Sequence, residues 1–364
     1  MSALKQTPLH QRHVQAGGRL VDFAGWEMPL QYTSVRAEEL AVREDAGLFD
    51  VSHMGRFEVH GARAGDFLQG VVTNDLTRLE DGEAQYNLLC DEHGGVLDDL
   101  VVYRGDPWRV VVNAANLESD RTWLRDHAPA GVQIEDRSRD LALIALQGPH
   151  AHTLLPCAGV DLDRLGFFGW AFGTVAGVPD VLISRTGYTG EDGFELFVPS
   201  PRVEQVWDAL VEAGATPAGL AARDVLRLEA GLRLHGNDMG PGVNPYEAGL
   251  GWVVKLQKGD FVGRTALARI KEQGATRKLV GVRGEGRTIP RHGETVVDPR
   301  GSEIGHVTSG TWSYWLKEGI GMALLERPAI PPDGRLGVVQ RGRPAAASVA
   351  GLPFYRGSVK QPGA

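Results

Sequence analysis

The sequence predicts an α+β fold whose final part is a separate antiparallel β domain. The first 255 residues mix β-hairpins with amphipathic helices and lack the regular strand–helix alternation of a parallel sheet. After about residue 275 the chain consists of short alternating segments separated by Gly- and Pro-containing turns, which is typical of an antiparallel barrel or sandwich. A chain of 364 residues also exceeds what one hydrophobic core usually supports, so two or three domains are expected.

Composition narrows the class of protein. The net charge of −8 argues against a nucleic-acid binder held by a general basic surface. Cys90 and Cys157 are the only cysteines, too few for a disulfide framework or a four-cysteine metal site. Residues 1–8 lack the apolar core of a signal peptide, and no uninterrupted apolar stretch reaches 18 residues. We therefore expect a cytoplasmic protein that binds neither nucleic acid nor membrane.

Two hairpins are predicted in the first 255 residues. Segments 100–103 and 110–113 flank Gly105-Asp106-Pro107, which indicates a short turn. Segments 181–184 and 194–198 flank a polar, Gly-rich stretch and predict a hairpin with a longer connection.

Three helices are predicted from apolar spacing and end signals. Ser200-Pro201 begins the first. Its apolar face is expected to comprise Val203, Val206, Trp207, Leu210 and Val211. Asn116 is the expected cap of a second helix, which runs to His127. A third helix, over 221–234, places Arg223 and Arg227 four residues apart on one face.

The C-terminal strands are predicted from alternation and turns. Residues 278–283 alternate between apolar and other side chains. Asp298-Pro299-Arg300-Gly301 and Arg341-Gly342-Arg343-Pro344 each mark a turn between two strands.

Two adjacent aspartates at the start of an apolar strand are the first candidate site. Because side chains alternate along a strand, Asp99 shares one face with Val101 and Tyr103, while Asp98 lies on the other. A carboxylate on an enclosed apolar surface costs free energy unless a polar group binds it. Asp99 is thus a candidate functional group, and the alternative is that both aspartates are solvated acids beside a turn.

The stretch 186–195 is the second candidate site. It combines glycines, aromatic residues and acids, so Tyr188 could stack on a flat ring while Glu195 receives paired donors. The alternative is an exposed acidic loop with Glu195 facing water. His53 fits a buried or capping histidine better than a ligand. The sequence contains no phosphate loop, dinucleotide fingerprint, zinc-protease motif or serine-nucleophile motif.

Together these stretches give the chain a resemblance to the aminomethyltransferases (T-proteins) of the glycine cleavage system over nearly its whole length. The matching segments are 7–9, 21–29, 49–54, 94–103, 111–116, 147–149, 186–195, 222–224, 227–230, 308–311 and 353–359. The resemblance implies a three-domain cloverleaf around a folate pocket. Two intertwined α+β domains with antiparallel sheets would occupy 1–260, roughly as 1–50 with 140–255 and as 51–139. A β-barrel or jelly-roll-like domain would occupy 275–364.

The resemblance also implies a reaction. Such a protein transfers the one-carbon unit from an aminomethyl group on the dihydrolipoyl arm of a carrier (H) protein to tetrahydrofolate. The products are 5,10-methylenetetrahydrofolate, ammonia and the dihydrolipoyl carrier. Tetrahydrofolate would be a co-substrate, no metal is expected, and the functional associates would be the lipoylated H protein and the P- and L-proteins.

Carried over residue by residue, the resemblance assigns Asp99 as the catalytic carboxylate. A fixed anion there would stabilise the positive charge that develops as a folate nitrogen attacks, and would orient or accept a proton. Glu195 matches the acid that binds the pterin, whose adjacent N–H groups suit a carboxylate. Arg223 matches a folate-site arginine, with an ion pair inside its own helix as the alternative, and Arg227 is interpreted as structural. The pocket would be lined by Tyr86, Tyr103, Asn113, Tyr188, Val101 and Met54.

The chain departs from the family pattern at a few positions. Phe167-Phe168 replaces a pair of tyrosines that is common in the family, and Leu232 and His235 stand at positions where a relative can carry tyrosine. A basic cluster of Lys255, Lys258 and Arg264 is a candidate docking face for an acidic carrier.

Alternative functions are less well supported. A folate-binding sister group that assembles or repairs iron–sulfur proteins carries a Lys-Gly-Cys-Tyr-x-Gly-Gln-Glu stretch, whereas residues 232–239 contain no cysteine. The folate-binding half of a dimethylglycine- or sarcosine-oxidising enzyme would need a flavin domain, for which 364 residues leave no room. A folate-binding scaffold without activity is disfavoured because Asp99 is present.

Overall fold

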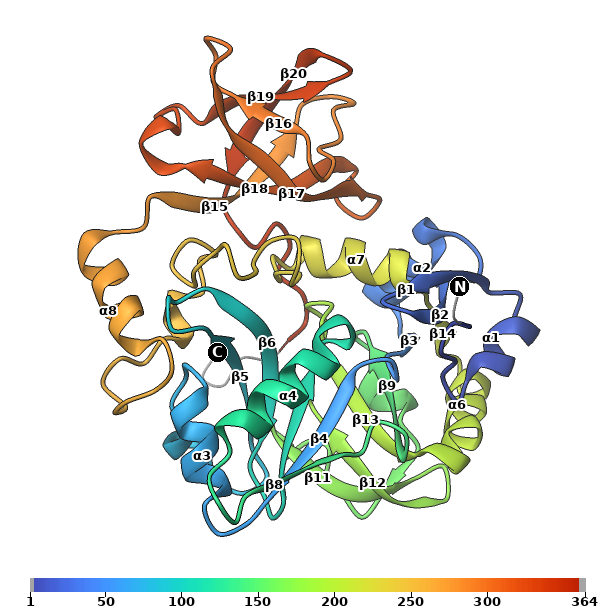
Figure 1. Cartoon of the computed structure of the whole chain (residues 1–364). Helices are drawn as coiled ribbons and strands as arrows, with labels where there is room; N and C mark the ends of the chain where they lie inside the picture. The colour runs from blue at the N-terminus through green and yellow to red at the C-terminus, as the bar shows by residue number, and fades with distance from the viewer. Residues whose placement is uncertain (1–2, 360–364) are drawn as a thin grey trace.

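Two sheets that share one core and a closed six-stranded barrel form the computed structural model, which describes residues 3–359 (Figure 1). All strand pairs within the sheets and barrel are antiparallel except β14–β3. The predicted α+β class with a C-terminal barrel is therefore confirmed. The outermost residues of the expected domains, 1–2 and 360–364, lie outside the described part of the chain.

The seven-stranded sheet has the order β10-β11-β12-β13-β9-β3-β14. Its strands are β3 (Gly47–Asp50), β9 (Leu141–Gln147), β10 (Cys157–Ala158), β11 (Trp170–Val175), β12 (Val178–Ser184), β13 (Gly193–Pro199) and β14 (Thr216–Pro217). β9 is apolar along both faces, as expected for a strand buried on both sides, and it pairs with β13 and β3. The predicted hairpin of β12 and β13 is confirmed.

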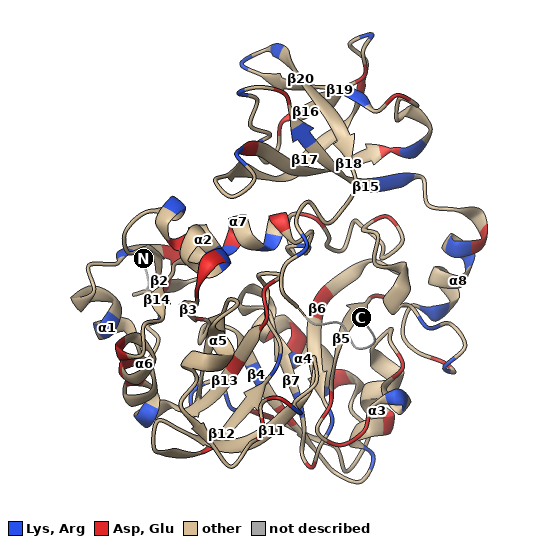
Figure 2. Ribbon diagram, turned by 180° about the vertical axis from the view of Figure 1, so that it is seen from behind, with Lys and Arg blue, Asp and Glu red and all other residues tan. Residues whose placement is uncertain are grey.

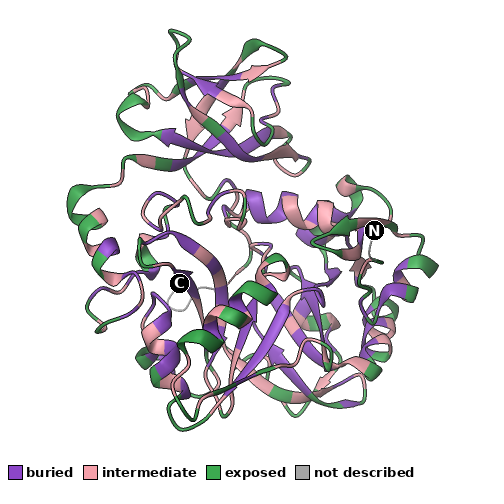
Figure 3. Cartoon of the chain, in the orientation of Figure 1, coloured by how far each residue is buried: buried purple, intermediate pink, exposed green. Residues whose placement is uncertain are grey.

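The five-stranded sheet has the order β5-β6-β7-β4-β8. Its strands are β4 (Gly55–His60), β5 (Ala84–Cys90), β6 (Val96–Tyr103), β7 (Trp108–Val112) and β8 (Gln133–Asp136). The predicted hairpin of β6 and β7 is confirmed. β4 is buried along nearly its whole length (Figure 3). A separate ribbon pairs β1 (Arg19–Phe23) with β2 (Trp26–Gln31).

The two sheets face each other across a shared core. This core includes Phe49 and Ala145 from the larger sheet and Val111 from the smaller one. Tyr103 of β6 meets Phe197 of β13 edge to face, with ring centroids 5.4 Å apart. β6, which carries the aspartate pair, therefore runs along the junction between the sheets.

Helices cover the outer faces of the sheets and link them to the barrel. They are α1 (His10–Gln15), α2 (Val35–Glu44), α3 (Ala64–Val71), α4 (Leu117–His127), α5 (Ala151–Leu154), α6 (Val203–Glu212), α7 (Leu220–Glu229) and α8 (Arg264–Gln273). Short 3-10 turns are η1 (Leu76–Arg78), η2 (Ala114–Asn116), η3 (Ser200–Arg202), η4 (Gly251–Val253) and η5 (Arg327–Ala329). No helix within residues 3–359 is long and apolar enough to cross a membrane.

Two helix predictions need correction. The helix expected over 221–234 ends at Glu229, because Gly231 adopts a left-handed conformation (φ 69°) and the chain then turns under the barrel. Val211 was expected on the apolar face of α6, but it is 38% exposed. The buried residues of α6 are Val203, Val206, Trp207 and Leu210.

The barrel closes in the order β15-β18-β17-β16-β19-β20. Its strands are β15 (Arg277–Gly284), β16 (Thr295–Val297), β17 (Glu303–Ser313), β18 (Glu318–Glu326), β19 (Arg335–Gln340) and β20 (Arg343–Ala350). Both predicted turns, at Asp298–Gly301 and 341–344, lie where two of these strands connect. Val280 and Val282 of β15 belong to the barrel interior, while Leu279 packs outward with Leu228 of α7.

Buried charges join the barrel to α2 and α7, which lies between the barrel and the sheets in Figure 1. The Arg43 side chain of α2 is fully buried and pairs with Glu191 and Glu229. Arg227 of α7 pairs with Asp238 at 2.7 Å and donates to the hydroxyl of Ser309 in β17 at 2.8 Å. These contacts fit the interpretation of Arg227 as structural.

Candidate active site

The aspartate pair enters β6 from a turn that is fixed by glycine. A side chain at Gly95 would place its Cβ 2.2 Å from the carbonyl oxygen of Pro241, so only glycine fits there. Asp98 is fully buried, and Asp99 has intermediate exposure. The alternative in which both aspartates are solvated is therefore wrong, and neither side chain projects freely into water.

Asp99 is held by donors from both neighbouring strands. The Tyr86 hydroxyl of β5 donates to Oδ2 at 3.1 Å, and Nδ2 of Asn113, just after β7, donates to Oδ1 at 2.8 Å. Tyr86 reaches Asp99 because the register pairs Tyr86 with Val101, two residues along the same face of β6. Burial and the neighbouring Asp98 raise the pKa of Asp99 to about 7. A carboxyl group tuned in this way can take up and release a proton near neutral pH.

Asp98 organises the residues that hold Asp99. It accepts the backbone N–H of Asn113 at 3.1 Å, Nδ2 of Asn113 at 2.8 Å and Nδ2 of Asn116 at 2.7 Å. Asn116 stands at the predicted cap position of α4, but its side chain makes no capping bond. It also lies 2.9 Å from Nδ1 of His235. The expected cap is therefore corrected, because the Asn116 amide is used in the aspartate network.

Glu195, Arg223 and Tyr188 form a second group. The Thr186 hydroxyl donates to Glu195, and the guanidinium carbon of Arg223 lies 4.7 Å from the centre of the Tyr188 ring. The Arg223 charge interacts favourably with that of Glu195, although burial lowers the pKa of Arg223. Nη1 of Arg223 is buried and has no hydrogen-bond partner among the described residues.

The expected alternative role of Arg223, an ion pair within its own helix, does not occur in the described chain. Asp224, its neighbour on α7, pairs with Arg227 instead, at 2.8 Å. Arg223 is thus a half-buried cation whose buried Nη1 has no partner in the described chain.

Tyr188 connects the two groups. Burial raises its pKa, and the charges of Asp99 and Arg223 both act on it. Its hydroxyl donates to the carbonyl oxygen of Arg233. Tyr103 is nearly fully buried. Burial raises the pKa of Tyr103, and the charge of Glu195 raises it further.

The apolar wall between these groups contains the other predicted residues. Met54 and Val101 are partly buried and pack against the core cluster that includes Tyr103. Phe168 packs on the same cluster, with Phe167 edge to face against it at 4.8 Å, so this pair adds apolar surface without hydroxyl groups. The structure thus gathers all the predicted site residues around the junction of the two sheets.

Sequence reasoning missed several residues of this region. Trp252 is 60% exposed and stacks on Tyr86, with ring centroids 6.1 Å apart. Asn116, Asp120 and His235 join the aspartate network through contacts that local sequence does not reveal. The four-residue spacing of Asn116, at the start of α4, and Asp120 was the only available signal. His53 is buried as predicted, and burial lowers its pKa to about 4.

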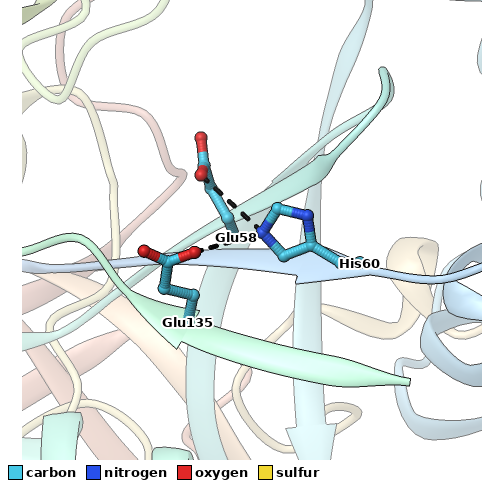
Figure 4. Close-up of side chains that lie close together, drawn as sticks. All are labelled: Glu58, His60 and Glu135. Atoms are coloured by element: carbon cyan, nitrogen blue, oxygen red, sulfur yellow. Dashed lines mark ion pairs between the residues drawn. The ribbon is translucent and has the colours of Figure 1, made fainter. Parts of the chain in front are cut away.

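Two polar features lie outside this region. Glu58, His60 and Glu135 gather on β4 and β8 (Figure 4). Glu58 already pairs with Arg137 at 3.0 Å and Arg109 at 3.3 Å, so ion pairing explains this cluster.

A groove of about 400 Å³ on the barrel is lined by Arg277, Glu303, Ile304, Gly305, His306, Leu324 and Glu326. Arg277 in that groove is already paired with Glu247.

Comparison with known proteins gives a consistent result along the whole chain. Residues 9–258 match the GCVT N-terminal domain family, and residues 277–356 match the glycine cleavage T-protein C-terminal barrel domain family. The chain is 48% identical over 362 residues to an aminomethyltransferase of Herpetosiphon aurantiacus. This alignment covers 98% of the present chain and 100% of the relative. It is 50% identical over 368 residues to one of Symbiobacterium thermophilum, covering 97% and 98% respectively.

A solved structure agrees with the fold. The crystal structure of the glycine cleavage system aminomethyltransferase T from Bartonella henselae superposes with a TM-score of 0.92 at 36% identity. The match covers 98% of this chain and 100% of that structure.

Proposed function

Since this chain belongs to the family of aminomethyltransferases (T-proteins) of the glycine cleavage system, we propose that its acceptor is tetrahydrofolate and that Asp99 is its catalytic residue. The donor would be the aminomethyl group on the dihydrolipoyl arm of a carrier (H) protein. The products would be 5,10-methylenetetrahydrofolate, ammonia and the dihydrolipoyl carrier.

The observation that carries this proposal is the environment of Asp99. Tyr86 and Asn113 fix both of its oxygens, and its pKa of about 7 suits proton transfer at neutral pH. As the two folate nitrogens bond to the aminomethyl carbon, the bonds from that carbon to its amino nitrogen and to sulfur break. Positive charge develops on each attacking nitrogen, and the protons that leave the two nitrogens end on ammonia and on the dihydrolipoyl thiol. Asp99 in its ionised form would stabilise the charge and accept a proton at a carboxylate oxygen.

The second group of residues fits a folate. Glu195 offers a carboxylate for the paired N–H donors of a pterin, and Tyr188 offers a ring face. Arg223 supplies the unused buried donor Nη1, which favours a polar ligand atom beside it. A folate stacked on Tyr188 would lie beside Arg223, whose guanidinium carbon is 4.7 Å from the centre of that ring, and within range of the Asp99 charge.

The partners are proposed to be the lipoylated H protein and, functionally, the P- and L-proteins. Lys and Arg residues gather on α8 (Figure 2), where Arg269 and Lys271 are exposed and Arg264 is half-buried. This face suits an acidic carrier. Lys258 is a poor member of the predicted docking cluster, because its ammonium group donates to the carbonyl of Gln69 and burial lowers its pKa to about 7.

Both cysteines are free, which fits action in the reducing cytoplasm.

Ammonia release from aminomethylated carrier protein, with and without tetrahydrofolate, tests the reaction. We expect release that depends strongly on tetrahydrofolate in the native protein. Asp99→Ala should lower turnover by about 10²- to 10⁴-fold, the range for a positioned acid–base group, with little change in tetrahydrofolate affinity. Asp126→Asn, at an exposed position of α4, is the control and should behave as the native protein does. Turnover of Asp99→Ala within a few-fold of the native value would contradict the role of Asp99.

A further inference from the structure

His235 lies in the loop after α7 and reaches across to the strand that carries both aspartates. Its side chain is 12% exposed. Nδ1 of the imidazole lies 2.9 Å from Nδ2 of Asn116, and Nε2 lies 3.4 Å from the carbonyl oxygen of Val96, the first residue of β6. One imidazole therefore contacts both the start of β6 and an amide that is bonded to Asp98.

The orientation of the Asn116 amide determines the form of this imidazole. Nδ2 of Asn116 donates to Oδ1 of Asp98 at 2.7 Å, and the opposite orientation would place the amide oxygen against the carboxylate. The second hydrogen on Nδ2 is then directed at Nδ1 of His235, which accepts it and so carries no proton. The proton of the neutral imidazole lies on Nε2, which faces the carbonyl oxygen of Val96.

A charged histidine paired directly with Asp98 is the alternative arrangement. Nδ1 of His235 lies 3.9 Å from Oδ1 of Asp98, which is beyond hydrogen-bond distance. A proton on Nδ1 would also point at Nδ2 of Asn116 over 2.9 Å, so that two donors would face each other. The distances therefore favour the neutral imidazole, with the Asn116 amide between it and Asp98.

The loop that presents His235 is held at both ends of the contact. The buried side chain of Asp238 accepts the backbone N–H of Leu234 at 2.9 Å and pairs with Arg227 at 2.7 Å. Further along the loop, the carbonyl oxygen of Gly240 accepts the backbone N–H of Val96 at 3.2 Å. Because the loop is bonded to α7 on one side and to β6 on the other, the imidazole is presented to Asn116 in a fixed place.

We propose that His235 is a positioning residue whose neutral imidazole holds the Asn116 amide against Asp98. Asp98 in turn accepts Nδ2 of Asn113 at 2.8 Å, and the same nitrogen lies 2.8 Å from Oδ1 of Asp99. Without the imidazole the Asn116 amide can turn away, and Asp98 then loses one of the three N–H bonds that fix its orientation. The proposal rests on the proposed transferase function for its consequence in catalysis.

Two substitutions of His235 separate the hydrogen bond from the rest of the side chain. His235→Ala removes the acceptor, so kcat should fall roughly 3- to 10-fold, the cost of one hydrogen bond, while tetrahydrofolate affinity measured by calorimetry stays the same. His235→Asn supplies an amide oxygen that can accept in place of Nδ1, so kcat should return to within about twofold of the native value. His93→Asn, at an exposed position in the turn before β6, is the matched control and should behave as the native protein does.

A double-variant cycle tests the route through Asn116. If His235 acts through this amide, His235→Ala should cause no further loss of kcat in a protein that already carries Asn116→Ala. Heteronuclear NMR of isotopically labelled histidine rings gives a readout that does not depend on turnover. At neutral pH, the ring signals that disappear in His235→Asn should be those of a neutral imidazole with its proton on Nε2.

The outcomes are distinct. A charged imidazole or a proton on Nδ1 in the NMR spectrum would overturn the proposal, as would additive losses of kcat in the double variant. A His235→Asn variant as impaired as His235→Ala would also overturn it, and so would a His235→Ala variant that keeps its kcat and loses tetrahydrofolate affinity. If the native protein released no ammonia, the proposed function would fail, whereas the NMR spectrum would still report the state of His235.

Discussion

The junction between barrel and sheets should make the stability of this protein fall as pH rises. Glu39 of α2 accepts the backbone N–H of Trp315, at the end of β17, at 2.9 Å, and its carboxyl group lies against that of Glu229. Glu229 and Glu191 share the single buried guanidinium of Arg43. Three carboxyl groups with one cation leave a charge that burial does not tolerate, so a proton is retained.

The sign and size of the effect follow from that proton. Burial and the neighbouring Glu229 raise the pKa of Glu39 from 4.5 to about 8. At pH values between these two, Glu39 holds a proton in the folded state that it has released in the unfolded state. The stabilisation from this proton is therefore fully present below the pKa of Glu39 in the unfolded state, and it is lost as the pH rises through the pKa of Glu39 in the folded state. One proton changes the free energy of unfolding by about 1.4 kcal/mol per pH unit, which gives at most about 4 kcal/mol between pH 5 and pH 8.

Glu39→Gln should remove this dependence. The glutamine keeps the oxygen that accepts the Trp315 N–H and replaces the proton with a permanent donor towards Glu229. We expect equal stability at pH 5 and a clearly more stable variant at pH 8, measured by urea unfolding with tryptophan fluorescence at several pH values. Glu44→Gln, at an exposed position of the same helix, should follow the native protein. Parallel pH curves for the native protein and Glu39→Gln would refute the reasoning, because the proton would then lie elsewhere.

Three further predictions concern substrates. Glu195→Gln should weaken tetrahydrofolate binding more than tenfold by calorimetry, since a bond to a charged group contributes on the order of 1.5–3 kcal/mol, and unchanged affinity would return Glu195 to a solvated strand position. Free aminomethyl-lipoamide should be a much poorer substrate than the whole carrier in kcat/KM, because it lacks the docking energy of the carrier. Raising salt from about 50 to 500 mM should lower the activity with the carrier protein but not the activity with free aminomethyl-lipoamide, because salt screens exposed protein charges. An equal salt response of the two substrates would exclude a charged docking face.

Local sequence determined the elements whose signals lie within a few residues. The β6–β7 hairpin was predictable because Gly105-Asp106-Pro107 separates two apolar runs. The alternation that puts Asp99 on the face of Val101 and Tyr103 follows from strand geometry alone. The turns of the barrel were likewise marked by Gly and Pro, whose backbone preferences act at a single position.

Tertiary structure decided what those residues touch. Asn116 looked like a helix cap, yet its amide bonds to Asp98 and to His235, which is 119 residues away. The predicted end of α7 was wrong because Gly231 and the contacts of the following loop end the helix, against the helical propensity of Leu232, Arg233 and Leu234. Asp120 and Glu39 read as ordinary acids in the sequence. Their protonation depends on burial and on carboxyl groups brought beside them by the fold, and neither can be read from neighbours along the chain.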